Sequence, residues 1–251
     1  MHSDHPLRPD GRAFHVPATA EQVAGRSCLL PGDPDRCDLI ASLWTDAQLV
    51  GEHREHRVFT GTYRGAKICC CSTGVGGPSA ANALEELAML GVKRFVRVGT
   101  TGSLKQSVAV GHVVVNTAAV RHDGTSDAYA PSCYPAVADF DLTLALRQAC
   151  LDTGLTAHLG ICCSTASFYA GQGRPGLRSL SLPGDVDIQD RMTALGVTNF
   201  EMEAATLFTL GQIFGLQVGA VCHVIANRVT KELDEGDIIP MLRAACDALS
   251  R

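Results

Sequence analysis

The sequence has little positive charge and few aromatic side chains. Its 251 residues carry 21 Lys and Arg against 26 Asp and Glu, a net charge of −5, and aromatic residues make up 5%. The overall basic field that attracts nucleic acid or an anionic membrane is therefore absent, so an anion must be held by a local site. We expect neither nucleic acid nor membrane among the partners of this chain.

Long apolar runs are also missing. No stretch approaches the length of a membrane-spanning helix. Residues 1–25 are polar and interrupted by Pro6, Pro9 and Pro17, without the apolar centre of a signal peptide. These features predict a cytoplasmic protein.

Disulfides are not expected, although eleven cysteines are present. Cysteines are consecutive at residues 69–71 and again at 162–163, in apolar, strand-like runs. Neighbouring strand residues point to opposite faces of a sheet, so such runs form neither disulfide pairs nor a four-ligand metal cage. We interpret these cysteines as small buried hydrophobic residues kept reduced in a cytoplasm.

Several catalytic signatures are absent as well. The glycine-rich run at residues 73–77 has neither dinucleotide-binding spacing nor the Lys-Ser/Thr pair of a phosphate-binding P-loop. No Gly-x-Ser-x-Gly nucleophile turn occurs. His53 and His56 lack the further ligands that a metal site needs. We expect no redox cofactor and no catalytic metal.

Extended and helical patterns alternate along the chain. Strands are predicted at residues 27–30, 58–63, 67–71, 94–98, 113–120, 157–163, 197–200 and 217–225. Helices are predicted at residues 37–43, 80–90, 140–153, 186–195, 204–214 and 238–249, with a Gly/Pro/Ser-rich loop at 170–184. This order predicts an α/β fold, a three-layer α/β/α arrangement with a mixed central sheet, in a single domain spanning residues 1–251. Ligands of such sheets bind beyond the carboxyl ends of the strands.

Glycine and arginine follow two of these strands. Gly32 and Arg36 come after the first strand, and Arg97 lies on the strand that leads into Gly99-Thr100-Thr101-Gly102. Glycine N–H groups, threonine hydroxyls and guanidinium groups all donate to phosphate oxygens. Together they favour a phosphate pocket at one sheet edge.

Two further clusters suit a nucleoside. Phe168, Gln172 and Arg174 offer a stacking face, an amide and a guanidinium, which complement the O2, N3–H and O4 edge of uracil. Glu201 and Glu203, two residues apart, share a face if the strand continues through them, and carboxylates accept hydrogen bonds from vicinal sugar hydroxyls.

Each cluster also has a plain structural interpretation. Arg36 could lie on a helix surface, and Arg97 could pair with a buried acid such as Glu85 or Glu86. Phe168 could pack into the core beneath a solvated loop. The paired glutamates could stabilise the N-terminus of the following helix.

The motifs taken together resemble one protein family. Residues 31–36 (PGDPDR), 53–55 (HRE) and 97–102 (RVGTTG) are similar to the nucleoside phosphorylase-I family. Residues 168–174 (FYAGQGR), 201–203 (EME) and 225–228 (IANR) narrow the resemblance to its bacterial uridine phosphorylase branch. The similarity extends from about Phe14 to the C-terminus.

The resemblance implies a role for each motif residue. Phosphate would be bound by Gly32, Arg36, Arg97, Thr100 and, from a neighbouring subunit, Arg54. Uracil would be bound by Phe168, Gln172, Arg174 and Arg228. Ribose would be bound by Glu201, Met202, Glu203 and a dimer-crossing His15. The expected catalytic residues are Arg97, Gln172, Arg174 and Glu203. A structural potassium ion would be held by Glu55, Val75 and Ser79.

The implied reaction is the reversible phosphorolysis of uridine to uracil and ribose 1-phosphate, with deoxyuridine and thymidine as further candidates. Inorganic phosphate is then a co-substrate, and no cofactor is needed. The resemblance also implies a dimer-based homo-oligomer, up to a hexamer, with residues 1–25 partly at an interface. The resemblance further implies that purine-specific relatives carry an aspartate after the last strand, where residues 225–228 of this chain (IANR) contain no acid. The alternatives are a purine nucleoside phosphorylase, a nucleosidase of the same fold and a non-catalytic nucleoside-binding protein.

Overall fold

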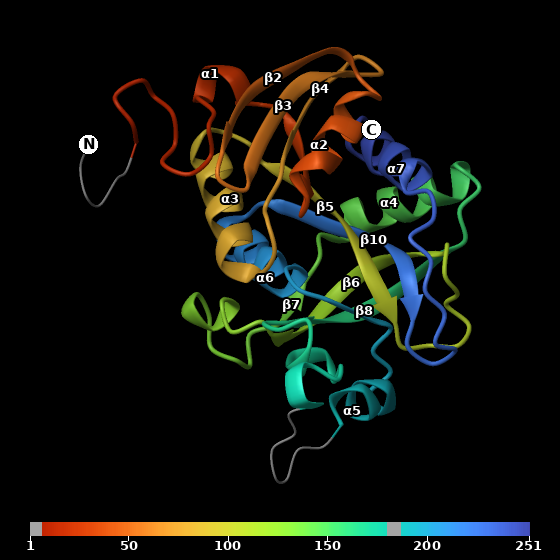
Figure 1. The fold of residues 1–251 in the computed structure, drawn as a ribbon. Helices are drawn as coiled ribbons and strands as arrows, with labels where there is room; N and C mark the ends of the chain where they lie inside the picture. Colours follow the sequence, from red (N-terminus) through yellow and green to blue (C-terminus); the bar gives the residue numbers. More distant parts are fainter. Residues whose placement is uncertain (1–6, 180–186) are drawn as a thin grey trace.

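The computed structural model describes residues 7–179 and 187–251 (Figure 1). The strands are β1 (Ser27–Pro31), β2 (Thr45–His53), β3 (His56–Tyr63), β4 (Ala66–Cys71), β5 (Arg94–Ser103), β6 (Val113–His122), β7 (Ala136–Val137), β8 (Ala157–Thr165), β9 (Asn199–Glu201) and β10 (Gln217–Asn227). The helices are α1 (Ala20–Val23), α2 (Pro34–Ala41), α3 (Gly77–Met89), α4 (Phe140–Asp152), α5 (Ile188–Ala194), α6 (Ala204–Phe214) and α7 (Ile239–Leu249). Three single 3-10 turns are η1 (Ser126–Ala128), η2 (Ala170–Gln172) and η3 (Leu177–Ser179).

The strands form one mixed sheet in the order β10-β6-β8-β9-β5-β1-β4-β3-β2. Strands β4, β1, β5 and β10 run parallel, whereas β6 is antiparallel to β10. Strand β9 pairs with both β8 and β5, and β10 also pairs with β5, so this half of the sheet closes into a ring. The predicted mixed sheet is confirmed. Alternation alone does not reveal the closure, because it depends on a strand of only 3 residues.

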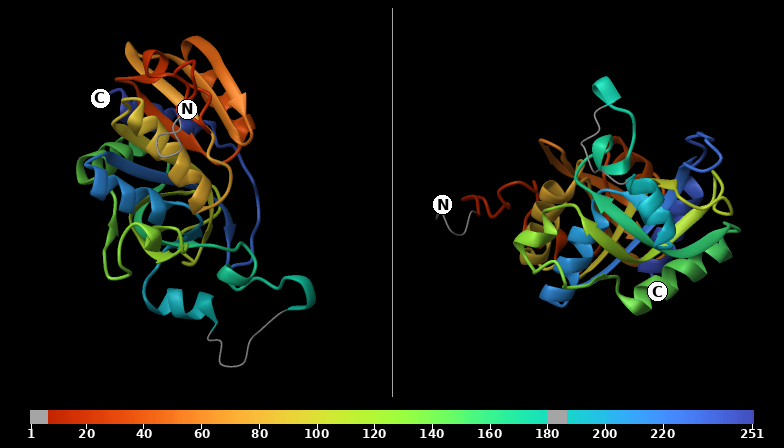
Figure 2. Two further views of the ribbon diagram at one scale, coloured as in Figure 1. Left: turned by 90° about the vertical axis from the view of Figure 1, so that its left-hand side faces the viewer. Right: turned by 90° about the horizontal axis from the view of Figure 1, so that it is seen from below.

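Helices cover both faces of the sheet, as Figures 1 and 2 show. Helices α3 and α6 pack together on one face, where Leu84 and Phe208 belong to the same apolar core. Helices α2, α4 and α7 cover the other face, with Ile40, Leu146 and Leu242 in a second core. The predicted three-layer arrangement is therefore confirmed.

Strand β5 is longer than its apolar residues predict. Residues 99–102, expected to form the loop after the strand, lie inside it. Gly102 pairs with Ala226 of β10 and with Phe200 of β9, so neighbours on both sides keep the backbone extended. The threonines and glycines of the expected loop are thus held by strand pairing.

Strand β2 was not predicted, because it lies at the sheet edge and its residues from Thr45 to Leu49 are exposed and mostly polar. Helix α5 begins at Ile188. Its predicted first residue, Val186, lies outside the described residues, as do residues 180–184 of the predicted loop and residues 1–6 of the N-terminal segment.

All eleven cysteines are free, and all except Cys133 are buried. Burial raises the pKa of the Cys150 thiol to about 12, which keeps it protonated and unreactive. These findings confirm the interpretation of the cysteines as buried hydrophobic residues. Across the described ranges, each helix is too short or too polar to cross a membrane.

Candidate active site

A cavity of about 680 Å³ opens where β1, β5 and β10 end. Its lining combines the first glycine-rich turn, the end of β5, the 168–174 loop and the β9–α6 junction. It brings together most of the residues singled out in the sequence, namely Gly32, Arg36, Val75, Arg97, Thr100, Phe168, Gln172, Arg174, Glu201, Met202 and Glu203. The predicted phosphate, base and ribose groups therefore share one pocket of a size suited to a small ligand.

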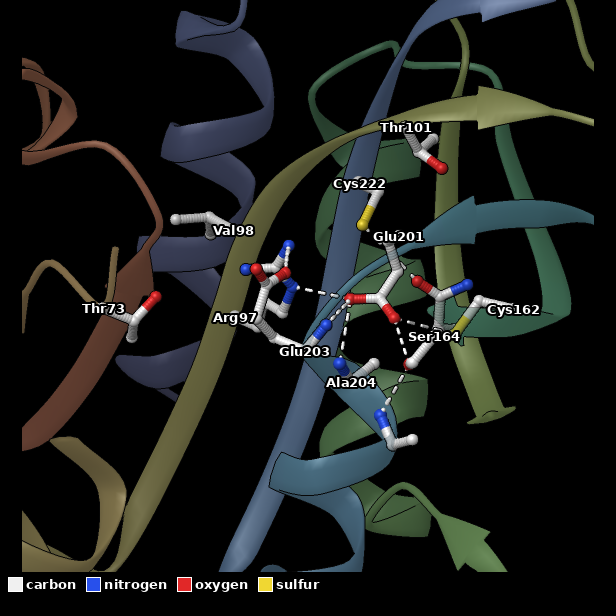
Figure 3. Close-up of polar contacts among 12 residues, drawn as sticks. Thr73, Arg97, Val98, Thr101, Cys162, Ser164, Glu201, Glu203, Ala204 and Cys222 are labelled. Carbon is white, nitrogen blue, oxygen red and sulfur yellow. Dashed lines mark hydrogen bonds and ion pairs between the residues drawn. The ribbon is translucent and has the colours of Figure 1, made fainter. Parts of the chain in front are cut away.

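Arg97 is buried at the floor of this pocket, with 5% of its surface exposed. Its Nε donates to Glu201 Oε2 at 3.0 Å, and one terminal nitrogen pairs with Glu203 (Figure 3). Burial opposes the charge of Arg97, but Glu203 and Glu201 raise the pKa of its guanidinium above the usual range. The suggested pairing with Glu85 or Glu86 is wrong, because both acids lie elsewhere and bind other partners. Those partners are Tyr129 and His15, respectively.

Glu201 organises the start of α6. Its Oε2 accepts the backbone N–H groups of Glu203 at 2.9 Å and Ala204 at 2.8 Å, and its Oε1 accepts the hydroxyl of Ser164 (Figure 3). A carboxylate at a helix N-terminus is stabilised by the unsatisfied N–H groups and by the helix dipole. The helix-terminus interpretation therefore holds for Glu201, whose oxygens are all engaged within the chain.

Glu203 faces the pocket from the first residue before α6. Strand β9 ends at Glu201, so the two acids do not share a strand face, yet both reach Arg97. The backbone N–H of Gly76 donates to Glu203 Oε1 at 2.5 Å. Burial is the main influence that raises the pKa of Glu203, while Arg97 works in the opposite direction. The site thus holds a buried carboxylate beside a buried guanidinium.

One end of the pocket, formed by Gly32, Arg36, Arg97 and Thr100 and called the anion end below, has unused hydrogen-bond donors. Among the described residues, Nη1 of the buried Arg97 has no hydrogen-bond partner. Within residues 7–179 and 187–251, half-buried Arg36 makes a single long side-chain contact, from Nη1 to the Val98 carbonyl at 3.5 Å, and burial lowers its pKa. A Cβ on Gly32 would lie 3.2 Å from the Gly74 carbonyl, so glycine suits this close turn. With Thr100 also in the lining, this end can bind an anion.

The opposite end is built by the 168–174 loop. The guanidinium of Arg174 lies 3.9 Å from the centroid of the Phe168 ring, a cation–π distance. The same guanidinium donates to Gln172 Oε1, and Gln172 Nε2 donates to the Thr165 hydroxyl at 3.2 Å. Phe168 is 48% exposed, so the alternative that placed it in the core is wrong. Burial and the neighbouring Arg228 lower the pKa of Arg174 to about 10, which leaves it charged at neutral pH.

Arg228 fastens the segment after β10 to this loop. Its guanidinium donates to the carbonyl of Gln172 at 3.1 Å and that of Gly173 at 3.4 Å. Asn227, in the stretch where purine-specific relatives are expected to carry an acid, is buried and holds the turn. Its side chain donates to two carbonyls and accepts two N–H groups, from Val229 and Thr230.

Comparison with known proteins agrees with this geometry. The sequence model of the phosphorylase superfamily matches residues 26–251. The chain belongs to this superfamily. It is 48% identical to a uridine phosphorylase of Thermococcus kodakarensis over 92% of this chain and 83% of that protein. It is 41% identical to the Escherichia coli uridine phosphorylase over 89% of each chain, and 39% identical to a guanosine phosphorylase of Halorubrum lacusprofundi over 84% of each.

Some residues expected to act in this phosphorylase lie outside the cavity of their own chain. His15 is fixed to α3, with its Nδ1 2.7 Å from Glu86 Oε1 and its backbone N–H bonded to the same carboxylate. Arg54 is exposed in the turn between β2 and β3. Glu55 and Ser79 meet, since the serine hydroxyl donates to the carboxylate at 2.5 Å.

Other residues that support this candidate site do not belong to any of the motifs in the sequence. Ser164 and Thr165 hold Glu201 and Gln172, respectively, and the N–H of Gly76 holds Glu203. The sequence does mark Ser164 and Thr165, because polar residues end the largely apolar β8 just as they end β5. Apart from the glycine-rich turn in which it lies, nothing in the sequence indicates that Gly76 binds Glu203.

Proposed function

We propose that this chain catalyses the phosphorolysis of uridine to uracil and ribose 1-phosphate. The main support for this proposal is the arrangement of one cavity. The guanidinium groups of Arg36 and Arg97 lie at one end, Gln172 and Arg174 lie at the other, and the buried carboxylate of Glu203 lies between them. That order matches phosphate, base and ribose in a nucleoside undergoing attack at C1′. Relatives named uridine phosphorylase support the choice of substrate.

Phosphate is bound by Gly32, Arg36, Arg97 and Thr100. The free Nη1 of Arg97 and the loosely held Arg36 supply charged donors, and both lie in a partly buried site where such bonds are strong. Holding phosphate beneath the sugar turns an encounter of two solutes into a positioned reaction.

Uracil leaves as a stabilised anion. Gln172 and Arg174 donate to the ring oxygens as negative charge grows on them, and Phe168 provides a face against which the ring stacks. Arg228 holds the loop that carries these residues. No proton donor of the kind used on purines is required.

Ribose hydroxyls bind at Glu203 and Met202. Glu203 keeps one oxygen toward Arg97 and the other on Gly76, so it is fixed to accept from vicinal hydroxyls as C1′ develops positive charge. Glu201, with its oxygens occupied, acts on ribose by positioning Arg97 and Glu203.

The functional unit is a dimer-based homo-oligomer, up to a hexamer, of single phosphorylase domains. His15 and Arg54 lie away from their own cavity, which fits delivery of both into a neighbour's site. Residues 1–25 then lie partly at that interface. Glu55 and Ser79 meet beside Gly74, the residue before Val75, and their oxygens suit a potassium ion there. The setting is cytoplasmic.

Mixing two inactive variants tests the shared site. Arg54→Ala and Gln172→Ala are each expected to be nearly inactive, but mixed oligomers combine an intact loop from one chain with an intact arginine from the other. About a quarter of wild-type activity should return in randomly mixed dimers. No recovery, despite exchange of subunits shown by mass spectrometry, would mean that Arg54 serves its own chain.

The reaction itself is tested by incubating the purified protein with uridine, with and without phosphate, and following uracil. Uracil release that requires phosphate supports phosphorolysis, whereas equal release without phosphate identifies a nucleosidase. Because one relative is named a guanosine phosphorylase, guanosine and inosine are run in parallel. Cleavage of these purine nucleosides alone would overturn the assignment to uridine.

A further inference from the structure

His223, on β10, is a buried histidine without a hydrogen-bond partner. It is 3% exposed, and in the described part of the chain neither ring nitrogen has a hydrogen bond of standard geometry, although the Glu235 backbone lies near enough to raise the pKa of the ring. Buried polar atoms are nearly always satisfied, so an imidazole left in this state is placed to form new contacts when its protonation or the segment beside it changes.

The strand register places His223 beside the anion end of the cavity. In the parallel pairing of β5 and β10, His223 lies opposite Thr100, and paired residues of parallel strands point to the same face. Thr100 lines the cavity, together with Arg36 from α2. The imidazole is therefore next to the proposed phosphate site, although it does not line the cavity itself.

The segment that follows β10 covers the imidazole from the other side. A Cβ on Gly236 would lie 3.1 Å from His223 Nε2, so the absence of a side chain there lets the backbone approach the ring. Leu233 of the same segment lines the cavity, and Arg228, just before the segment, binds the 168–174 loop. The covering segment, residues 229–237, thus runs from the base end to the anion end.

Opposed charges surround the ring. Burial, first, and the positive charge of Arg36 lower the pKa of His223, whereas the Glu235 carbonyl and the carboxylates of Asp237 and Asp234 raise it, with a net lowering. The ring is therefore neutral at neutral pH. A dianion bound to Arg36 offsets the guanidinium charge and adds negative charge nearby, which favours the imidazolium.

We propose that His223 is a positioning residue that takes up a proton from solvent when an anion binds at Arg36, and that the resulting imidazolium draws the covering segment over the cavity. The attraction is to Asp234, Asp237 and the carbonyl of Glu235, all of which act on the ring. This inference rests on the proposed phosphate site, and it adds a link between occupancy of that site and closure over the substrate.

Sulfate is the appropriate probe, because it stays a dianion across the pH range in which phosphate itself titrates. Sulfate binding is measured by calorimetry at about pH 6 in two buffers of different ionisation enthalpy, which yields the number of protons taken up. The wild type should take up on the order of half a proton per site, and His223→Gln close to none. Proton uptake that persists in His223→Gln would overturn the proposal and identify another group, such as Glu203.

Two controls separate this inference from the proposed function. His158→Gln removes another histidine with a lowered pKa at the far end of β8, and it should keep the full uptake. Failure of the wild type to bind either sulfate or phosphate would refute the anion site itself, whereas binding without proton uptake refutes only the role of His223. Hydrogen exchange at residues 229–237 should slow at least several-fold on sulfate binding in the wild type and less in His223→Gln; equal slowing in both contradicts the link.

Discussion

The anion end of the cavity is held by strands and by the start of a helix, whereas the base end is carried by a loop. Arg97 and Glu201 are almost fully buried, and their contacts tie β5 to β9 and α6. Phe168 and Arg174 are partly exposed and depend on contacts within a short stretch of the chain. Of the side chains proposed to bind the anion, Arg97 also holds the fold, whereas Phe168 and Arg174, proposed to bind the base, make their contacts within their own loop. Substitutions at the two ends should therefore separate stability from activity.

The largest effect is expected at Arg97. Arg97→Gln leaves two buried carboxylates without a counter-charge, so unfolding in urea should show a loss of about 3–5 kcal/mol, and uridine cleavage should become undetectable. Arg97→Lys keeps the charge but loses the Nε bond, and should lose less stability.

Arg36→Gln is the matched control for Arg97. Arg36 makes only one long contact, so this variant should lose activity with little change in stability. Equal stability losses in the two variants would contradict this difference, because Arg36 would then hold the fold as much as Arg97 does.

At the base end, Gln172→Ala should lower activity strongly while the protein stays nearly as stable as the wild type. Loss of one donor to the departing uracil should lower kcat by about 10²–10³-fold. The free energy of unfolding should fall by only about 1 kcal/mol, since the one side-chain bond lost to the protein core is that to Thr165. Gln148→Ala, on the exposed face of α4, is the control for a glutamine without this role. A stability loss as large as that of Arg97→Gln would contradict the division.

The difference between the ends also explains what the sequence could predict. The short runs at residues 97–102 and 168–174 carry most of the chemistry locally, so their placement in a common site could be predicted from motifs. The partner of Arg97 could not, because Glu201 is 104 residues away and reaches it only through the ring closed by β9. Glu85 and Glu86 are nearer in sequence, but they lie on α3 and bind residues outside the sheet.

The edge strand β2 and the roles of the supporting residues Ser164 and His223 could not be predicted from the sequence for related reasons. Strand β2 is polar and exposed, so it lacks the alternation by which strands are predicted. Ser164 acts through Glu201, and His223 through a segment that crosses it, so neither forms a motif by itself. Such roles depend on tertiary contacts, which local spacing does not encode.

A smaller effect is expected at Ser164, which supports the anion end without touching its ligand. Ser164→Ala removes the hydroxyl that donates to Glu201 and accepts the N–H of Ala205 at 2.8 Å. Chemical denaturation should show a loss of about 1–3 kcal/mol, with activity reduced less than tenfold. Ser42→Ala, at the end of α2, serves as the control for a serine with one carbonyl bond. If Ser164→Ala abolished activity at unchanged stability, Ser164 would belong to the reacting groups instead.

The smallest effect is expected at Phe168, and it tests whether the base end is as independent of the fold as its contacts indicate. Phe168→Leu keeps an apolar side chain but removes the ring beneath the Arg174 guanidinium, a contact worth about 0.5–2 kcal/mol at partly exposed sites. The KM for uridine should rise several-fold, because both the stacking face and the position of Arg174 are lost, while the free energy of unfolding falls by no more than this contact contributes, about 0.5–2 kcal/mol. Tyr169→Leu is the matched control, since this neighbouring ring is more exposed and packs edge-on against Phe168. If both variants raise KM equally, the aromatic pair contributes only bulk. If Phe168→Leu instead lowers stability while KM is unchanged, the loop belongs with the core, and the contrast between the two ends of the cavity fails.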